Sequence, residues 1–372
     1  MTPWRLLDPG PLPAWRQMAL DSVVIRARAD NRVPDTLRFM EFEPHTALVG
    51  YHQAVDLEIN RQICDELGVE INRRITGGGA IYMDARQLGW EMCLGQDNAA
   101  LPRDPDAVYR TLSRVVVETL AAFGIAARFR PVNDVEVAGR KISGTGGVEW
   151  GDALIYQGTL LVDFDVETML RVLRLAIEKL TDKEVLSFQQ RIVTMAELLG
   201  AAPAMTVVKA EVVRAVQKVL EVTVYPESLT TEEEADWLRV QDSFRQPDWI
   251  DRRVARLAGY DVKTAQVKAP GGLLRAQAAV DADAGRIRKV FLTGDFFVYP
   301  ERAPLDLEAS LKDCPLEAAA VHERVAAHYA EGYRYLGVSV DDWFRVIVQA
   351  AGLDGKGESD GHHQSGPRDR SH

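Results

Sequence analysis

The amino-acid sequence predicts an α/β (α+β) protein with a large first domain, a smaller second domain and a polar tail. Up to about Gly200, segments with helical spacing of apolar residues alternate with segments rich in strand formers. The stretch "GAAPAM" at 200–205 has the composition of a linker, and almost no apolar residue follows Gly352. We therefore expect domains at 1–200 and 201–351 and a disordered tail at 352–372.

The first domain is predicted to begin with an amphipathic helix, because apolar residues, among them Met18, Val23 and Ile25, are mixed with Arg and Asp in this run. A second helix is predicted where apolar residues recur at steps of three and four, ending at Gly124. The predicted elements are a helix at 15–30, strands at "TLRFMEF" and "HTALVGY", a helix at 106–123, a strand at 153–164 and a helix at 166–180.

The second domain is predicted to open with a helix that Thr206 caps, with Val208, Val212 and Val216 on one face. Two alternating runs joined by "DADAG" then indicate a hairpin. Two further helices are predicted at 305–312 and 316–330. In the tail, His362 and His363 are interpreted as solvated residues rather than metal ligands.

Composition narrows the classes of function. The chain has 372 residues, 47% of them apolar, and a formal net charge of -11, which argues against a nucleic-acid-binding surface. No apolar run approaches the roughly 20 residues that span a bilayer, and no signal-peptide pattern is present, so we expect a cytoplasmic protein. Cys64, Cys93 and Cys314 are too far apart for a CxxC zinc site or a disulfide framework.

The stretch "RRITGGGAIYMD" (73–84) places two arginines before three consecutive glycines. Such glycines let backbone N–H groups approach an anion or a flat ring closely, and Arg73 and Arg74 can supply positive charge. Taken alone, the glycines are more often a tight turn. The pattern matches neither GxGxxG nor GxxxxGK[ST], which excludes Rossmann and P-loop sites.

A second stretch, "NDVEVAGRKISGTGG" (133–147), has a strand-like start, an Arg-Lys pair and another glycine-rich turn. Taken alone, it predicts a hairpin with a solvated lysine. Together the two stretches resemble the lipoate-protein ligase family, which has an RR-x-S/T-GGGA run and an N-D-x-x-V-x-G-R-K-I run about sixty residues later. The stretches "WRQMALD", "VGYHQAVDLEIN" and "SFQQRIVTM" are similar to other motifs of that family, and "GGLLRA" with "GRIRKVFLTGDFF" and "LEASLKD" resembles its C-terminal accessory domain.

This resemblance implies a biotin/lipoate ligase-like catalytic domain, with mixed sheets and flanking helices, and a small α+β accessory domain. It implies a two-step reaction with ATP and Mg²⁺ in which lipoate becomes lipoyl-AMP and pyrophosphate leaves. An acceptor lysine then takes the lipoyl group as an amide. The acceptor is expected to be an E2 lipoyl domain, a glycine-cleavage H protein or an H-like lipoate-binding protein, and the enzyme is expected to be a monomer without nucleic-acid or membrane partners.

The resemblance also implies the site residues. Lys141 is expected to lie between the lipoyl carbonyl and the α-phosphate as a fixed positive charge. Asp134 is expected to hold Mg²⁺, which prefers oxygen ligands. The acyl pocket is expected to include His52, Gln53 and Gly144. The residues expected to bind the nucleotide or lipoyl-AMP are Arg74, Gly77, Gly78, Gly79, Ala80, Ile81, Tyr82, Asn133, Asp134 and Lys141.

The family pattern is broken after the glycines, where Met83, Arg86, Gln87 and Gly89 replace expected residues, so acyl or acceptor preference stays open. Met83 and Trp90 fit a lipoyl tunnel or an ordinary core. Three alternatives also stay open. A cysteine-thioester octanoyltransferase needs an activated thiolate, and 130–141 contains no Cys, although Cys93 remains. A biotin-protein ligase lacks support because its GRGRxGR-type loop is absent, and a non-catalytic binding homologue remains. A basic rim near Arg128, Arg130 and Arg140 is predicted to receive an acidic acceptor.

Overall fold

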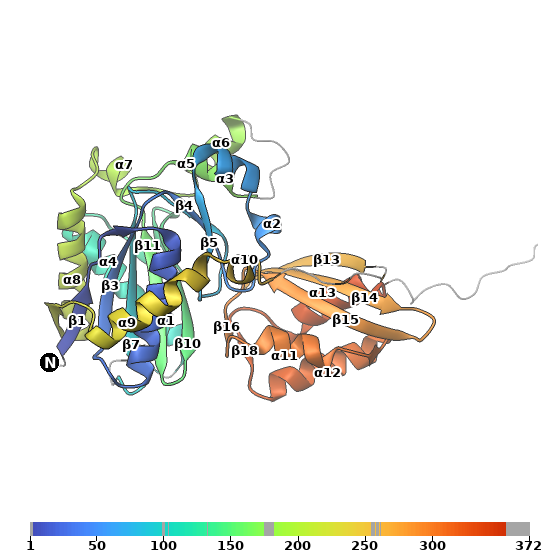
Figure 1. The fold of residues 1–372 in the computed structure, drawn as a ribbon. Coiled ribbons are helices and arrows are strands. Elements are labelled where there is room, and N and C mark those ends of the chain that lie inside the picture. Colours follow the sequence, from blue (N-terminus) through green and yellow to red (C-terminus); the bar gives the residue numbers. More distant parts are fainter. Residues whose placement is uncertain are drawn as a thin grey trace, which may run out of the picture.

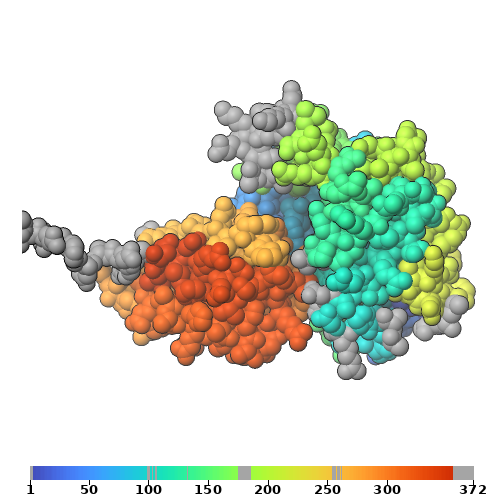
Figure 2. Space-filling view, turned by 180° about the vertical axis from the view of Figure 1, so that it is seen from behind, coloured from blue at the N-terminus to red at the C-terminus, as the bar shows by residue number. Residues whose placement is uncertain are grey.

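The computed structural model describes residues 3–98, 101–102, 104–131, 133–174, 182–253, 257, 260 and 262–354. The described chain forms two lobes with separate hydrophobic cores (Figure 1). Seen from behind, the residues after about 262 form the orange and red lobe, beside the larger lobe built by the earlier residues (Figure 2). The predicted tail from 355 onward lies outside the described residues, and so do His362 and His363.

A nine-stranded sheet organises the first lobe. Its strands run in the order β12-β1-β3-β7-β11-β10-β9-β8, and β2 pairs with β3. Strand β1 is parallel to both β12 and β3, whereas the pairs from β3 to β8 are antiparallel. The strand bounds are β1 (Pro3–Leu7), β2 (Pro11–Leu12), β3 (Thr36–Phe42), β7 (Leu88–Gly95), β8 (Arg128–Arg130), β9 (Asp134–Val137), β10 (Arg140–Trp150), β11 (Ala153–Leu160) and β12 (Thr223–Pro226).

Period-two alternation gives each face of this sheet its own core. On β7, Trp90 and Met92 pack with α4 (Pro105–Ala122) and α8 (Met205–Leu220), whereas Cys93 packs with α1 (Ala14–Ala29) on the other face. Helix α9 (Thr231–Val240) crosses the α1 face (Figure 1) and begins with a capping box formed by Thr230 and Glu233. The central strands are therefore covered on both sides.

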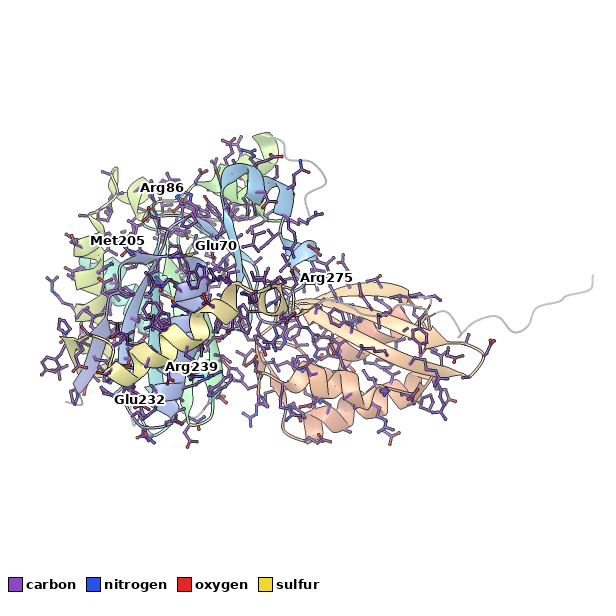
Figure 3. The ribbon with its side chains drawn as sticks, viewed as in Figure 1. Glu70, Arg86, Met205, Glu232, Arg239 and Arg275 are labelled. Atoms are coloured by element: carbon purple, nitrogen blue, oxygen red, sulfur yellow. The ribbon has the colours of Figure 1, made fainter. Side chains whose placement is uncertain are left out.

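A three-stranded sheet carries the first glycine motif. Strand β4 (Thr46–Val49) lies between β5 (Glu70–Arg73) and β6 (Ile81–Met83), so residues 74–80 form the connection that holds the three glycines. Glu70 accepts hydrogen bonds from the backbone N–H groups of Ala14 and Trp15 (Figure 3), which fastens this sheet to the start of α1. Of the short helices in this lobe, α3 (Arg61–Leu67), α5 (Val166–Val172), α10 (Pro247–Ile250) and the 3₁₀ turn η1 (Gln241–Arg245) contact this sheet. The others are α2 (Val55–Glu58), α6 (Asp182–Gln189) and α7 (Met195–Leu199).

The first lobe continues well beyond Gly200. Gly200 ends α7 with a positive φ, but α8 packs on α4, and β12 adds to the edge of the large sheet beside β1. The buried stripe of Val208, Val212 and Val216 belongs to the same cluster as the α4 side chains. The chain enters the second lobe between Arg253 and Val262, so the predicted linker at 200–205 joins α7 to α8 within the first lobe.

The second lobe is a four-stranded antiparallel sheet with three helices on one face. Its strands run in the order β13-β14-β15-β17, and β16 pairs with β18. The predicted hairpin is present, and Leu274, Ala276 and Ala278 are fully buried on one face. The elements are β13 (Val262–Ala269), β14 (Gly272–Asp281), β15 (Arg286–Gly294), β16 (Val298–Tyr299), α11 (Ala303–Ser310), β17 (Cys314–Pro315), α12 (Ala318–Ala330), β18 (Arg334–Tyr335) and α13 (Val340–Ala351).

One predicted helix was too long. The helix expected at 166–180 ends at Val172, because Leu173 adopts an extended conformation and bridges to Ile59, and residues 175–181 lie outside the described part of the chain. The two lobes are joined by an ion pair between Arg275 of β14, labelled in Figure 3, and Glu58 of α2.

Candidate active site

A cavity of about 290 Å³ lies where the two glycine-rich stretches meet. Its lining includes nine of the residues expected to bind nucleotide or lipoyl-AMP, and Gly144 as well. Those residues are Arg74, Gly77, Gly78, Gly79, Ala80, Ile81, Tyr82, Asn133 and Lys141. Two stretches that are about sixty residues apart in sequence therefore converge on one cavity.

The guanidinium of Arg74 holds the glycine connection in shape. It donates hydrogen bonds to the backbone oxygens of Leu48 at 3.1 Å, Gly77 at 3.2 Å and Gly79 at 2.8 Å. Burial lowers the pKa of Arg74 to about 10, so the group remains positively charged at neutral pH. Arg74 therefore both shapes the connection and places a buried positive charge beside the cavity.

Arg73, the last residue of β5, has a different set of partners from Arg74. Its guanidinium donates to the backbone oxygens of Gly50, Tyr51, Gln53 and Ile250, which ties the loop after β4 to α10. Burial, together with two neighbouring arginines, lowers its pKa to about 9. The arginine pair thus divides into one cavity residue and one structural residue.

Lys141 lies on β10 beside a β-bulge that separates it from Ser143 in register. Its Nζ atom lies 2.7 Å from Oδ1 of Asp134, whose Oδ2 accepts from Arg130 at 2.5 Å. The Lys141 side chain is 38% exposed and lines the cavity. The Asp134 carboxylate therefore holds the Lys141 ammonium at the cavity wall and also contacts the Arg130 guanidinium.

Gly144 leaves room for that lysine. A Cβ atom at position 144 would lie 2.5 Å from Nζ and 2.7 Å from Cε of Lys141. Asn133 is fixed across the hairpin by two hydrogen bonds to Thr145. Its side-chain amide donates to the backbone oxygen of Thr145 at 2.6 Å, and its backbone oxygen accepts from the Thr145 N–H at 2.9 Å. The hairpin from β9 to β10 therefore fixes both the lysine and the amide beside it.

Two predicted acyl-pocket residues lie elsewhere. His52 is buried and stacked on Phe296, with ring centroids 5.2 Å apart, and burial lowers its pKa well below the usual range. The Gln53 side chain accepts from the backbone N–H of Gly50 at 2.9 Å. Neither residue is in the cavity lining. Their "GYHQ" loop supports the glycine connection from behind.

The apolar lining was largely missed by sequence reasoning. Side chains from two hydrophobic clusters line the cavity, and Met83, one of the departures from the family pattern, is among them, whereas Trp90 is core. Such residues are scattered over six helices and strands and the connections between elements, and they carry no local signal. They are Met18, Met40, Phe42, Leu48 and Met83 from one cluster, and Leu161, Phe164, Met169, Leu173, Phe188, Ile192 and Phe297 from around the other.

The thiols lie away from the cavity. Cys64, Cys93 and Cys314 are buried, and none is in the lining. Burial raises the pKa of the Cys64 thiol to about 11 and that of Cys93 well above its usual range. A thiolate nucleophile needs the opposite environment. The site in this structure is built around a lysine ammonium rather than a thiol.

Acidic and basic groups near the cavity are paired. In the described part of the chain no group of three His, Cys, Asp or Glu side chains is arranged to hold a metal ion, so Asp134 is a single carboxylate candidate. Such a donor fits Mg²⁺ only when phosphate oxygens supply further ligands. Arg128 and Arg130 pair with Glu136, and Arg140 pairs with Glu197, so the predicted basic rim is neutralised by its neighbours.

Comparison with known protein families adds the deciding observation. A family model described as "Lipoyl protein ligase A/B catalytic domain" matches residues 13–217, which is more than half of the chain. The chain belongs to the lipoyl protein ligase A/B family. The lipoate-protein ligase resemblance is therefore confirmed, and the protein is an enzyme of lipoyl or octanoyl transfer.

Curated relatives in this family carry two activities in their names. "Octanoyltransferase LipM" of Geobacillus kaustophilus is 26% identical over 255 residues, covering 62% of this chain and 91% of that protein. "Octanoyltransferase LipM" of Kyrpidia tusciae is 26% identical and covers 68% and 100%. "Probable lipoate-protein ligase A" of Mycoplasma pneumoniae is also 26% identical and covers 70% and 74%.

Solved structures of lipoate ligases share the fold. LipL1 of P. falciparum, in complex with lipoate, has a TM-score of 0.69 at 16% identity and covers 93% of this chain and 99% of its own. The bipartite lipoate protein ligase of Thermoplasma acidophilum, whose study includes its E2 lipoyl domain, has a TM-score of 0.61 at 23% identity, covering 69% and 99%. Lipoate-protein ligase A bound with ATP has a TM-score of 0.58 at 23% identity, covering 67% and 98%. The predicted ligase-like α/β fold is confirmed. No helix in the described residues is long and apolar enough to cross a bilayer.

Proposed function

We propose that this protein is an ATP-dependent lipoate-protein ligase. It activates lipoate to lipoyl-AMP and transfers the lipoyl group to a lysine of a lipoyl-acceptor domain. The observation that carries the proposal is the Lys141 ammonium at the cavity wall, in a lining that contains no cysteine. A fixed cation suits an adenylate route, whereas a thioester route needs a thiolate.

In the first step, a carboxylate oxygen of lipoate attacks the α-phosphorus of ATP, the bond to the β,γ-phosphates breaks and pyrophosphate leaves. Negative groups approach each other in this step, so nearby cations lower its barrier. Lys141 supplies a positive charge on the β10 side of the cavity and Arg74 supplies one on the glycine side. Mg²⁺ held by Asp134 and the phosphates would add further charge neutralisation.

In the second step, the neutral ε-amine of the acceptor lysine attacks the acyl carbonyl carbon, and AMP leaves as the carbon–oxygen bond breaks. Lys141 stabilises the oxygen on which charge develops, and the proton of the amine passes to solvent or the departing phosphate. The apolar side chains of the lining suit an eight-carbon acyl chain. The acceptor is an E2 lipoyl domain, an H protein or an H-like lipoate-binding protein. The enzyme binds it as a monomer.

Octanoyl transfer without ATP is the second candidate, and the names of the LipM relatives favour it. It would require a thiol at the acyl carbonyl, and the burial of Cys64, Cys93 and Cys314 argues against that chemistry here.

The deciding measurement is pyrophosphate release by the purified protein with ATP, Mg²⁺ and either lipoate or octanoate. In the wild type, we expect pyrophosphate release that depends on the added lipoate or octanoate. In Lys141→Ala, we expect the rate of this release to fall about a hundredfold or more, the usual effect of removing a preorganised electrostatic group. Lys218→Ala, which removes an exposed lysine paired with Glu118, is the control and should keep full activity. Acyl transfer from a thioester donor without ATP, unaffected by Lys141→Ala, would instead establish the octanoyltransferase.

A further inference from the structure

The short segment 296–299 of the second lobe takes part in the hydrophobic cores of both lobes. Phe296 and Val298 pack in the second lobe's own cluster, whereas Phe297 and Tyr299 belong to the cluster of the first lobe. The Tyr299 hydroxyl lies 3.3 Å from that of Tyr109 on α4, and the Phe296 oxygen accepts from the backbone N–H of Gly78 at 3.2 Å. The segment is therefore inserted into the first lobe at the candidate active site.

The ring of Phe297 lies between the two glycine-rich stretches. A Cβ atom at Gly78 would lie 2.7 Å from Cζ of Phe297, and one at Gly146 would lie 2.8 Å from its Cε1. A Cβ at Gly77 would lie 2.7 Å from the Phe296 oxygen. The ring is also in edge contact with Tyr109, and Phe297 lines the cavity while being only 7% exposed.

Gly146 shows that this contact has a sequence requirement. Its φ is not in the positive range, so the backbone itself accepts any residue at this position. Apart from the Phe297 ring, the nearest atom to a Cβ there is the Gly77 oxygen, at 3.9 Å. The absence of a side chain at 146 is thus explained by the aromatic ring that the other lobe inserts.

We infer that Phe297 is a positioning residue of this site, which completes the cavity wall from the second lobe and keeps water from the activated acyl carbonyl. The inference rests on the proposed ligase function. A mixed anhydride is consumed wastefully when a water oxygen attacks the acyl carbon, AMP leaves with the bonding electrons, and a proton passes to solvent. An apolar ring packed against both glycine stretches excludes that water.

The test measures coupling rather than rate alone. In Phe297→Ala, we expect AMP formation without acceptor to rise about tenfold relative to wild type, and the number of acyl groups transferred per ATP to fall. Gly146→Ala should have the same effect, because its methyl group displaces the ring. In the double variant, the added methyl group enters space that the missing ring leaves free, so the second change should add nothing. Phe291→Ala, an equally buried phenylalanine of the same lobe outside the lining, is the matched control and should remain coupled.

Octanoate affinity, measured by titration calorimetry on the wild type and the same four variants, separates this inference from the proposed function. If the wild type releases no pyrophosphate or AMP, the ligase proposal fails. In that case, weaker octanoate binding in both single variants, with no further weakening in the double variant, would still support the role of Phe297 in the cavity wall. Coupling and octanoate affinity in Phe297→Ala equal to those of wild type would overturn the inference. Additive losses in the double variant would also overturn it.

Discussion

At the scale of single residues, the cavity depends on what glycine leaves out as much as on what other side chains supply. The ammonium of Lys141 occupies the place that a methyl group at 144 would take. Position 144 therefore helps to determine where the cation lies.

Gly144→Ala should displace the lysine without unfolding the hairpin, because the atoms that it meets are the far end of a flexible side chain. A misplacement of this size costs roughly ten- to a hundredfold in rate. We expect such a loss in the rate of lipoate- or octanoate-dependent pyrophosphate release, with an unchanged thermal midpoint. Adding Lys141→Ala should cause no loss beyond that of Lys141→Ala itself, and a further loss would mean that Gly144 acts by another route.

At the scale of elements, α12 contributes a buried histidine to the second lobe. His328 lies 3.0 Å from the Tyr335 hydroxyl through Nε2 and stacks on Tyr333, with centroids 4.1 Å apart. Burial lowers its pKa to about 4. The helix is therefore packed around a neutral imidazole.

The sign of the resulting pH dependence follows from linkage. Unfolded chains bind a proton at His with a pKa of about 6.5, so between about 6.5 and 4 the unfolded state binds more protons and stability falls as pH falls. Above about 6.5 this contribution is fully present. We expect the thermal midpoint of His328→Gln to decline less over that window than that of wild type. His322→Gln changes an exposed histidine on the same helix and should follow the wild-type profile; equal slopes in all three proteins would contradict the assignment.

At the scale of the whole molecule, the first lobe is closed by elements that follow Gly200. Helix α8 covers α4, β12 completes one edge of the large sheet, and the Glu233 carboxylate of α9 pairs with the buried Arg5 guanidinium of β1 at 2.5 to 2.7 Å. We propose that the boundary between independently folding units lies near 253 rather than 200.

Two shortened chains test this boundary. A chain of residues 1–200 should lack a cooperative thermal transition, because β1 would lose its edge partner and α4 its apolar cover. A chain of residues 1–253 should show a cooperative transition. The transition is measured by near-ultraviolet circular dichroism, which reports on the buried Trp4 and Trp90. Cooperative unfolding of 1–200 would restore the boundary that the sequence predicts.

Local patterns predicted most of the longer elements, whereas the family resemblance of two continuous stretches indicated Lys141, Asn133 and the glycines as site residues. Other features depend on partners far away in the chain. The valine stripe of α8 signals a buried face but not the lobe that buries it, and "TVYP" is too short to announce a sheet edge. Phe297 lies between β15 and β16, and nothing near it in sequence indicates that it lines a cavity built mostly by residues of the first lobe.

The pairing of β1 with β12 also has a consequence during translation. Strand β1 leaves the ribosome before β12, which is synthesised about 220 residues later, a delay on the order of 10–40 s at roughly 5–20 residues per second. During that interval, the edge of β1 that β12 will cover and the Arg5 side chain remain without their final partners. The nascent chain thus exposes an open strand edge that a holding chaperone is suited to shield.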